Sequence, residues 1–226
     1  MIRSGAARAE RGTRQSLSRA FIVEAALAEI DAKGLEGLSM RGLGSALRVE
    51  AMALYHHFPS KGELLDAVME RLLAEAELPE PGSMPPLERL RRFVRSYRQI
   101  AVRHPQAFIL LSARRFNTDA AFELYERILG TLAEAGFDAE LSARFFRLVG
   151  YYTGGAGLAE VASRAQGPDA TPVRLESFAD AERFPRVAAI APYLRVGKLE
   201  GVFEFGLDVI FDAMEKRAQT RKKRRA

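Results

Sequence analysis

The chain has 226 residues, of which 48% are hydrophobic, with no cysteine and a formal net charge of +5. This composition supports a sizeable core and argues against global disorder, and the lack of cysteine excludes disulfides and thiolate metal sites. No apolar segment follows the N-terminal arginines as in a signal peptide, and no window approaches the roughly 18 apolar residues of a membrane span. We therefore expect a cytoplasmic protein without a membrane partner.

The basic charge is concentrated at the two ends of the chain. Residues 1–15 carry +3 and residues 216–226 carry +7, which leaves −5 for the rest. Such segments are ordinarily solvated, although basic arms beside a DNA-binding domain also contact phosphates or enter the minor groove. We predict a flexible basic arm over 1–15 and a basic tail over 219–226, and the sequence leaves open whether either touches DNA.

Apolar residues recur at helical spacing along most of the chain, and no segment of any length alternates as a strand does. Gly34 and Gly136 follow two of the apolar segments, and Pro59 and Pro105 follow two others, as residues that end helices do. The predicted fold class is therefore all-α, with about nine helices. We expect them over 17–33, 39–47, 50–58, 60–76, 87–104, 108–116, 120–135, 138–161 and 199–218, with one short helix within 178–194.

Caps and breakers divide this helical pattern. Ser39 precedes one apolar segment as an N-cap, and Ser60 with Glu63 forms a capping box at the start of the next long helix. Asp138 is a further N-cap candidate. The proline-rich segment 78–86 and the segment 167–171, rich in Gly, Pro and Asp, read as breaks, and the first separates an N-terminal unit from the remainder.

The segment 39–61 has the spacing of two short helices joined by a tight turn, followed directly by the cap of a third. A recognition helix in a major groove presents small or polar side chains to base edges and hydrogen-bond donors to phosphates. Here the second helix begins with small and apolar residues and ends in Tyr55 and His56, and Lys61 adds a cation to a helix N-terminus that itself favours phosphate. The alternative is an ordinary helical hairpin with Tyr and His on its surface.

The stretches ALYHHFPSKGELL at 53–65 and GLEGLSMR at 34–41 make the pattern more specific. With them, the segment 17–73 closely resembles the N-terminal domain of TetR-family transcriptional regulators. The resemblance implies that Ser39 and Arg41 contact the DNA backbone or a base. It also implies that Ala51, Met52 and Ala53 face the bases, that Tyr55, His56 and Lys61 hold phosphates, and that Leu43, Leu47, Val49, Leu54 and Phe58 form the core.

The chain departs from this family at the turn, where Arg48 stands in the place that the family usually gives to glycine. Glycine suits a residue with positive φ, and another residue there costs on the order of 1 kcal/mol. A packed unit tolerates that cost, and we expect Arg48 to contact a phosphate.

Five cations balance five acids between Ser16 and Lys61, so the helix-turn-helix itself is neutral. Because affinity for DNA rests heavily on contacts between cations and phosphates, this neutrality favours a role for the N-terminal arm. We predict that deleting residues 1–15 weakens operator binding and lowers its salt dependence. A salt titration measures the slope of log K against log salt, and an unchanged slope contradicts the prediction.

The last predicted helix is apolar around most of its circumference, and Glu204, Asp208, Asp212 and Glu215 form its single water-exposed stripe. One apolar side of such a helix can face its own core, and another needs a partner. The preceding long helix is rich in glycine, which permits close helix approach. We expect a twofold homodimer through these two helices, as the resemblance also implies, with a well-packed monomeric core as the alternative. The interface residues are Gly150, Gly154, Gly157, Phe203, Gly206 and Ile210.

Aromatic residues in the C-terminal part, taken one at a time, are more often plain core than pocket. As a set, in a family whose C-terminal domain binds small effectors, they indicate an apolar cavity with few polar anchors. His104 lies outside the DNA-binding motif, and a role at a helix C-terminus or in the core competes with a ligand contact. The predicted effector-binding residues are Phe93, Tyr97, His104, Phe108, Phe116, Tyr125, Phe146 and Tyr152.

Together these features predict a ligand-responsive transcriptional regulator, most often a repressor, that binds a palindromic operator as a dimer and is released by a small, largely apolar effector. Its domains are a helix-turn-helix DNA-binding domain over 16–62 and a helical effector-binding and dimerisation domain over 63–218. We identify no catalytic residues, metal site or cofactor, since neither HExxH nor a phosphate-cradling glycine loop is present. The alternatives are an all-α enzyme and a helical protein-binding adaptor.

Overall fold

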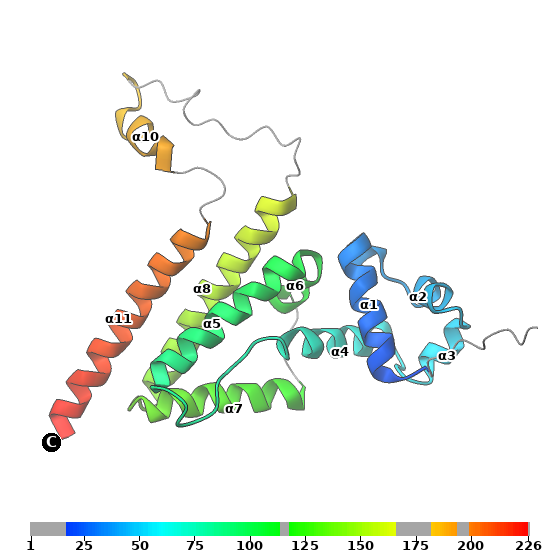
Figure 1. Ribbon diagram of the computed structural model, residues 1–226, viewed down its shortest axis with the longest axis horizontal. Coiled ribbons are helices and arrows are strands. Elements are labelled where there is room, and N and C mark those ends of the chain that lie inside the picture. The colour runs from blue at the N-terminus through cyan, green and yellow to red at the C-terminus, as the bar shows by residue number, and fades with distance from the viewer. Residues whose placement is uncertain (1–16, 114–117, 166–181, 194–198, 226) are drawn as a thin grey trace, which may run out of the picture.

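The computed structural model describes residues 17–113, 118–165, 182–193 and 199–225, and every regular element in these ranges is a helix. The all-α fold class is therefore confirmed. Figure 1 shows short helices gathered at one end of the molecule and longer ones forming its body. In chain order the elements are α1 (Arg19–Lys33), η1 (Leu35–Gly37), α2 (Met40–Leu47), α3 (Ala51–Tyr55), α4 (Lys61–Leu73), α5 (Pro86–Arg103), α6 (Pro105–Ala113), α7 (Asp119–Glu134), α8 (Ala139–Ala165), α10 (Pro185–Ile190), η2 (Ala191–Tyr193) and α11 (Leu199–Arg225).

The helix starts follow the predicted caps. The Ser39 hydroxyl accepts a hydrogen bond from the amide of Gly42 at 3.0 Å, and the Ser60 hydroxyl accepts one from Glu63 at 3.1 Å. The Asp138 carboxylate accepts from Leu141 at 2.9 Å. Each cap satisfies an amide that has no partner within its own helix, so short polar side chains in the sequence determine where these helices begin.

One hydrophobic cluster joins the N-terminal helices to the helices that follow them. Ile22, Leu54 and Phe58 belong to the same buried cluster as Phe108 and Leu111 of α6. The helix-turn-helix therefore does not rest on a separate core, since α4, the end of α5 and α6 form its base. A displacement of α4 or α6 is transmitted to α1 because packed interiors resist local deformation.

A second hydrophobic cluster holds the body of the molecule together. It brings Val94 of α5, Leu132 of α7 and Phe145 of α8 against Leu207 and Phe211 of α11. Tyr97 and Leu124 pack against both clusters. The two cores thus meet near the middle of α5.

The predicted water-exposed stripe of α11 is only partly exposed to water. Glu204 accepts hydrogen bonds from Arg95 of α5, at 2.7 Å from Nη2, and Asp208 is paired with Arg91 of the same helix. Asp212 and Glu215 are exposed, as predicted. The first half of the stripe therefore docks on arginines of α5, which the pattern of α11 alone does not indicate.

The observed helix limits differ from the predicted ones at several ends. Helix α4 ends at Leu73 rather than at residue 76, and α6 begins at Pro105, one turn before the expected start. Helix α11 continues to Arg225, so most of the predicted basic tail over 219–226 is helical. Lys, Arg and Gln are good helix formers and no Gly or Pro interrupts them, and cations suit a helix C-terminus. The arm 1–15 and the segment 167–171 lie outside the described residues.

No helix in the described ranges is long and apolar enough to cross a membrane.

Candidate DNA-binding surface and effector cavity

The turn between α2 and α3 has the left-handed conformation that the sequence predicts. Arg48 has φ 57° and ψ 42° and is the one non-glycine residue with positive φ in the described part of the chain. The backbone amides of Arg48 and Val49 close the turn with hydrogen bonds to α2. The Val49 amide donates to the carbonyl of Gly44 at 2.9 Å. A Cβ at Gly44 would lie 3.0 Å from the Val49 carbonyl oxygen, so glycine permits the close approach of α2 to the turn. Sequence analysis did not assign this role to Gly44.

The strained turn permits a test of Arg48. Replacing Arg48 by glycine removes a left-handed non-glycine residue, and we expect the free energy of unfolding to rise by up to about 1 kcal/mol. If Arg48 holds a phosphate, the same change weakens operator binding and lowers the salt slope by about one. Urea unfolding and a salt titration of operator affinity measure the two effects. A slope equal to that of the wild type would show that Arg48 holds no phosphate.

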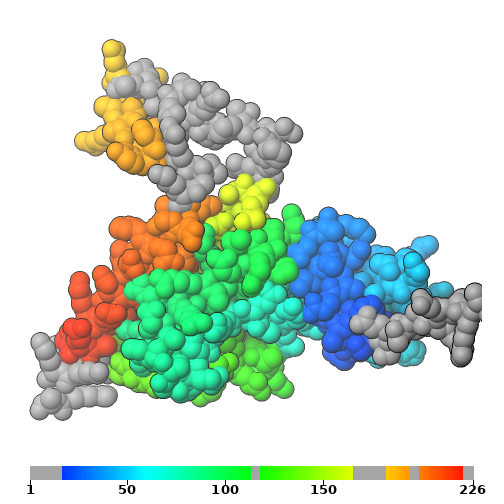
Figure 2. All heavy atoms as spheres, in the orientation of Figure 1, coloured from blue at the N-terminus to red at the C-terminus, as the bar shows by residue number. Residues whose placement is uncertain are grey.

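Helices α2 and α3, which carry or flank most of the predicted DNA-reading residues, lie at the end of the molecule farthest from the C-terminus of α11 (Figures 1 and 2). Met52 is 66% exposed although it is apolar, as a residue that reads bases would be. Tyr55 and His56 are also exposed, and Ala51 and Ala53 are half-buried. Ser39, Arg41 and Arg48 are exposed as well, although the Ser39 hydroxyl also caps α2.

Lys61 has a structural contact that the sequence did not indicate. Its ammonium donates a hydrogen bond to the carbonyl of Leu38, at 2.6 Å, directly before α2. An ammonium has three donors, so this bond leaves two for a phosphate. The contact ties the start of α4 to the start of α2 and holds the cation beside the reading surface.

Arg19 of α1 is a further residue that sequence analysis missed. Its guanidinium lies over the ring of Phe58, 4.1 Å from the centroid, and donates to the carbonyl of His57. Phe58 and Leu54 are fully buried beneath α3. Arg19 therefore covers the core under the recognition helix. The one feature of the sequence that could have pointed to Arg19 is its position directly after the N-cap Ser18.

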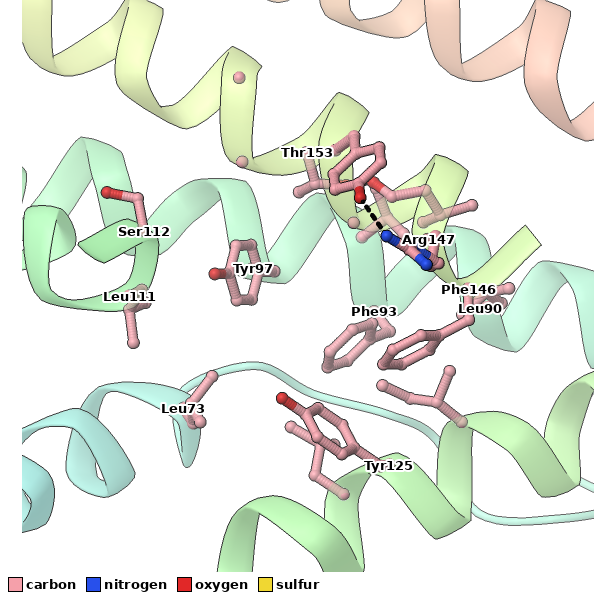
Figure 3. A pocket seen from close by; sticks show the side chains of 18 of the residues that line it. Leu73, Leu90, Phe93, Tyr97, Leu111, Ser112, Tyr125, Phe146, Arg147 and Thr153 are labelled. Atoms are coloured by element: carbon pink, nitrogen blue, oxygen red, sulfur yellow. Dashed lines mark hydrogen bonds between the residues drawn. The ribbon is translucent and has the colours of Figure 1, made fainter. Parts of the chain in front are cut away.

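A cavity of about 450 Å³ lies between α5, α7 and α8, and it reaches α4 and α6 at one end. This volume is within the range of pockets that hold drug-sized ligands. Figure 3 shows Phe93, Tyr97, Tyr125 and Phe146 around it, with Leu73 and Leu111 beyond Tyr97. Tyr125 and Phe146 contact each other edge to face, with centroids 5.2 Å apart, and Phe93 and Tyr97 are tilted against each other at 6.2 Å.

The polar groups of the cavity are few. The hydroxyls of Ser112 and Thr153 donate to backbone carbonyls of their own helices, at 2.9 and 2.7 Å. The hydroxyl of Tyr97 has no hydrogen-bond partner in the described ranges, and burial raises its pKa above the ordinary value, so it stays neutral. Arg147, which donates to Tyr151 at 2.8 Å, is the one charged residue among the described residues that line the cavity (Figure 3). A ligand would therefore meet mainly apolar surface, with Tyr97 as an inner anchor.

Three of the predicted effector-binding residues do not line the cavity. His104 is held by Asp31 and Glu75 at the end of α5, at 2.6 and 3.3 Å. Phe108 is fully buried under α8, and the hydroxyl of Tyr152 donates to the carbonyl of Phe203 at 2.7 Å on the opposite side of α8. Helical spacing does not show which neighbour each face meets, and here those faces meet protein. Phe116 lies outside the described residues, and Phe93, Tyr97, Tyr125 and Phe146 do line the cavity.

The glycines of α8 and α11 differ in what surrounds them within the chain. A Cβ at Gly157 would overlap the ring of Phe108, and one at Gly206 of α11 would overlap Tyr152, so both permit contacts within the chain. Gly150 and Gly154 line the cavity and have open space around the position of a Cβ. Phe203 is buried in the second hydrophobic cluster, and Ile210 packs against that cluster. The exposed apolar residues of these two helices are instead Leu148, Tyr151, Leu158, Val202, Phe205 and Val209.

Among the described residues no group of three or more His, Asp or Glu side chains could hold a metal ion.

Two family models match the chain. One, described as bacterial regulatory proteins of the tetR family, matches residues 22–68, and one, described as the tetracyclin repressor-like C-terminal domain, matches residues 78–218. The chain belongs to the TetR family. The predicted family is thereby confirmed, and the DNA-binding and effector domains of TetR-family regulators account for the helix-turn-helix and the helical body.

Relatives of this TetR-family chain agree with that assignment. The HTH-type transcriptional repressor DrrR1 of Streptomyces coeruleorubidus is 32% identical in an alignment of 228 positions, gaps included, that covers 92% of this chain and 81% of that protein. The tetracycline repressor class A from transposon 1721 of Escherichia coli is 32% identical in an alignment of 202 positions that covers 87% of this chain and 89% of that one. ActR of Streptomyces coelicolor in complex with actinorhodin superposes with a TM-score of 0.75 at 27% identity, covering 89% of this chain and 98% of that chain. The TetR-family chain is accordingly a ligand-responsive transcriptional regulator.

Proposed function

We propose that the protein acts as a homodimeric repressor in the cytoplasm, where it binds a palindromic operator and is released when a small, largely apolar effector occupies the cavity between α5, α7 and α8. The observation that carries this proposal is the position of the cavity. Leu73 of α4 and Leu111 of α6 line it and also belong to the hydrophobic cluster that supports the recognition helix. A ligand in the cavity therefore contacts the base of the DNA-binding helices directly.

The proposed DNA contacts are those of the exposed face of α2 and α3. Met52, with Ala51 and Ala53 beside it, would face the bases, while Tyr55, His56 and Arg48 would hold phosphates together with the two free donors of Lys61. Ser39 and Arg41 would contact the backbone or a base at the start of α2. Small and apolar side chains discriminate bases weakly, so phosphate contacts supply most of the affinity.

The proposed dimer interface is the exposed apolar face of α8 and α11. Tyr151 and Leu158 on α8 and Val202, Phe205 and Val209 on α11 are all exposed in the single chain. A monomer rarely leaves that many large apolar residues exposed on two neighbouring helices. A twofold axis through this face would pair two recognition helices for half-sites about 34 Å apart.

The proposed effector has an aromatic or otherwise apolar body, because aromatic rings line most of the cavity. One hydrogen-bonding group would meet the hydroxyl of Tyr97, and a polar group at the rim would meet Arg147. ActR, which has this fold, is found in complex with actinorhodin, so a protein of this fold can hold a small-molecule ligand. Release follows if the effector binds more tightly to a conformation in which the recognition helices no longer match the operator.

A footprint on the DNA that flanks the protein's own gene tests the proposed function. We expect one protected palindromic site and weaker binding by Tyr55→Ala and Lys61→Ala, each measured against Glu126→Ala on α7 as a control far from the reading face. Thermal-shift screening with apolar aromatic compounds then identifies the effector. The proposed function would be wrong if the protein bound no double-stranded site specifically and if neither substitution changed its weak non-specific binding. An adaptor or an enzyme would then be the better explanation.

The glycines that line the cavity give a direct test of its role. We predict that Gly154→Leu weakens effector binding at least about tenfold, because the new side chain occupies the cavity. The same substitution should raise the free energy of unfolding by up to about 1 kcal/mol, because glycine is a poor residue for the interior of a helix. Calorimetric titration with the first compound found in the screen measures the affinity. Gly130→Leu on α7 is the matched control, since it also has open space but lies outside the cavity lining. Equal affinity in Gly154→Leu and the wild type would place the effector elsewhere.

A further inference from the structure

A half-buried cluster of charged side chains lies where the DNA-binding helices meet the effector domain. His104 follows α5 directly before α6, and its Nδ1 lies 2.6 Å from Oδ2 of Asp31 on α1. Its Nε2 lies 3.3 Å from Oε1 of Glu75, which follows α4. The imidazole ring is thus held between a carboxylate of the DNA-binding domain and a carboxylate at the end of the helix that leads out of it.

The two carboxylates determine which form of the ring fits. A neutral imidazole has one N–H donor, whereas an imidazolium has two. Because both ring nitrogens face carboxylate oxygens, only the imidazolium donates on both sides. In the neutral ring one nitrogen lone pair would face a carboxylate, which is repulsive. Oδ1 of Asp31 is buried without a hydrogen-bond partner in the described part of the chain, so His104 is the group that compensates this carboxylate.

The surrounding charges make the contact to α1 the sensitive one. Glu75 also pairs with Arg71 of α4 at 2.8 Å and with Arg103 of α5 at 2.7 Å, and Arg71 reaches Glu24 of α1 as well. Helix α6, which packs against the same site, has no charged side chain between Pro105 and Ala113. Arginines keep their charge, so Glu75 stays compensated in a variant that lacks the imidazole ring. Asp31 does not, because His104 is its one partner among the described residues.

We propose that His104 is a positioning residue that holds α1, and with it the recognition helix, against the effector domain, through the contact between its Nδ1 and the carboxylate of Asp31. Its consequence for operator binding rests on the proposed function, whereas the orientation itself does not.

The experiment measures the orientation without DNA or effector. The chain has no cysteine, so spin labels can be attached at Glu36→Cys on η1 and Glu123→Cys on α7 without removing native thiols. Both positions are exposed. Labelled chain is mixed with an excess of unlabelled chain, so that distances within one chain dominate. Double electron–electron resonance gives the distance distributions.

The variants separate positioning from simple structural support. We expect a narrow distribution in the wild type and broad distributions in Asp31→Ala and His104→Leu, which remove the acceptor and the donor of this contact. His104→Asn retains an amide donor in the place of Nδ1, so it should keep the narrow distribution. Glu29→Gln, which breaks only the exposed pair with Lys33 within α1, should behave as the wild type.

Identical distributions in the wild type and His104→Leu would overturn the proposal, and so would a distribution in His104→Asn as broad as that in His104→Leu. Circular dichroism confirms that each variant is folded before labelling. Since no operator is used, failure to find a DNA site would overturn the proposed function and leave this result unaffected.

Discussion

Replacing Glu160 by leucine destabilises the protein by about 3–5 kcal/mol, because it leaves the guanidinium of Arg98 buried without its counter-charge. Arg98 and Glu160 join α5 to α8 and are 6% and 7% exposed. Arg98 also lies over the ring of Phe203, 4.9 Å from its centroid, so the same group supports the packing of α11. Urea unfolding at fixed protein concentration measures the change, since the stability of a dimer depends on concentration.

The double variant Arg98→Met/Glu160→Leu separates the ion pair from the packing. A buried pair replaced on both sides by apolar residues is often neutral or stabilising, so we expect the double variant to recover most of the loss. Glu140→Gln is the matched control, because it breaks an exposed pair with Arg144 on the same helix, and such pairs contribute about 0–1 kcal/mol. A single Glu160→Leu variant as stable as the control would show that water reaches the pair.

Phe58→Ala lowers the free energy of unfolding by about 3–5 kcal/mol, the range for truncating a buried aromatic residue. Phe58 is fully buried at the centre of the first core, beneath the recognition helix. The substitution also removes the ring over which Arg19 lies. We expect operator binding to fail near physiological temperature, because the support of α3 is lost before the body of the molecule unfolds.

Thermal unfolding, followed in parallel with operator binding, measures this effect. Phe122→Ala on α7 is the control, since Phe122 is 56% exposed and its truncation should change the stability by no more than about 0.5 kcal/mol. Operator binding by Phe58→Ala that matches the wild type at all temperatures would contradict the view that the first core positions the recognition helix.

The helix-turn-helix could be predicted because the interactions that form it are local in sequence. Ser39 and Ser60 cap helices that begin one residue later, and Arg48 adopts the positive φ expected from its place in the turn. Leu54 and Phe58 are buried as the spacing of apolar residues implied. Hydrogen bonds over three or four residues and the helical period can be read from neighbouring letters.

The effector site was only partly predictable, because it depends on contacts between distant segments. Phe93 and Phe108 look alike in sequence, yet Phe93 lines the cavity while Phe108 fills the space left by Gly157 of α8. His104 and Tyr152 likewise find protein partners, one on α1 and the other on α11. Which face of a helix meets protein and which meets a cavity depends on how the neighbouring helices pack.

The sequence by itself therefore determined the all-α class, the family and the local geometry of the DNA-binding motif, since caps, turn residues and helical period act within a few residues. Only the tertiary structure decided which aromatic residues surround the cavity, that Asp208 and Glu204 of α11 pair with Arg91 and Arg95, and that His104 links the two domains. These depend on the packing of helices far apart in the chain, where each side chain's role is determined by what it meets.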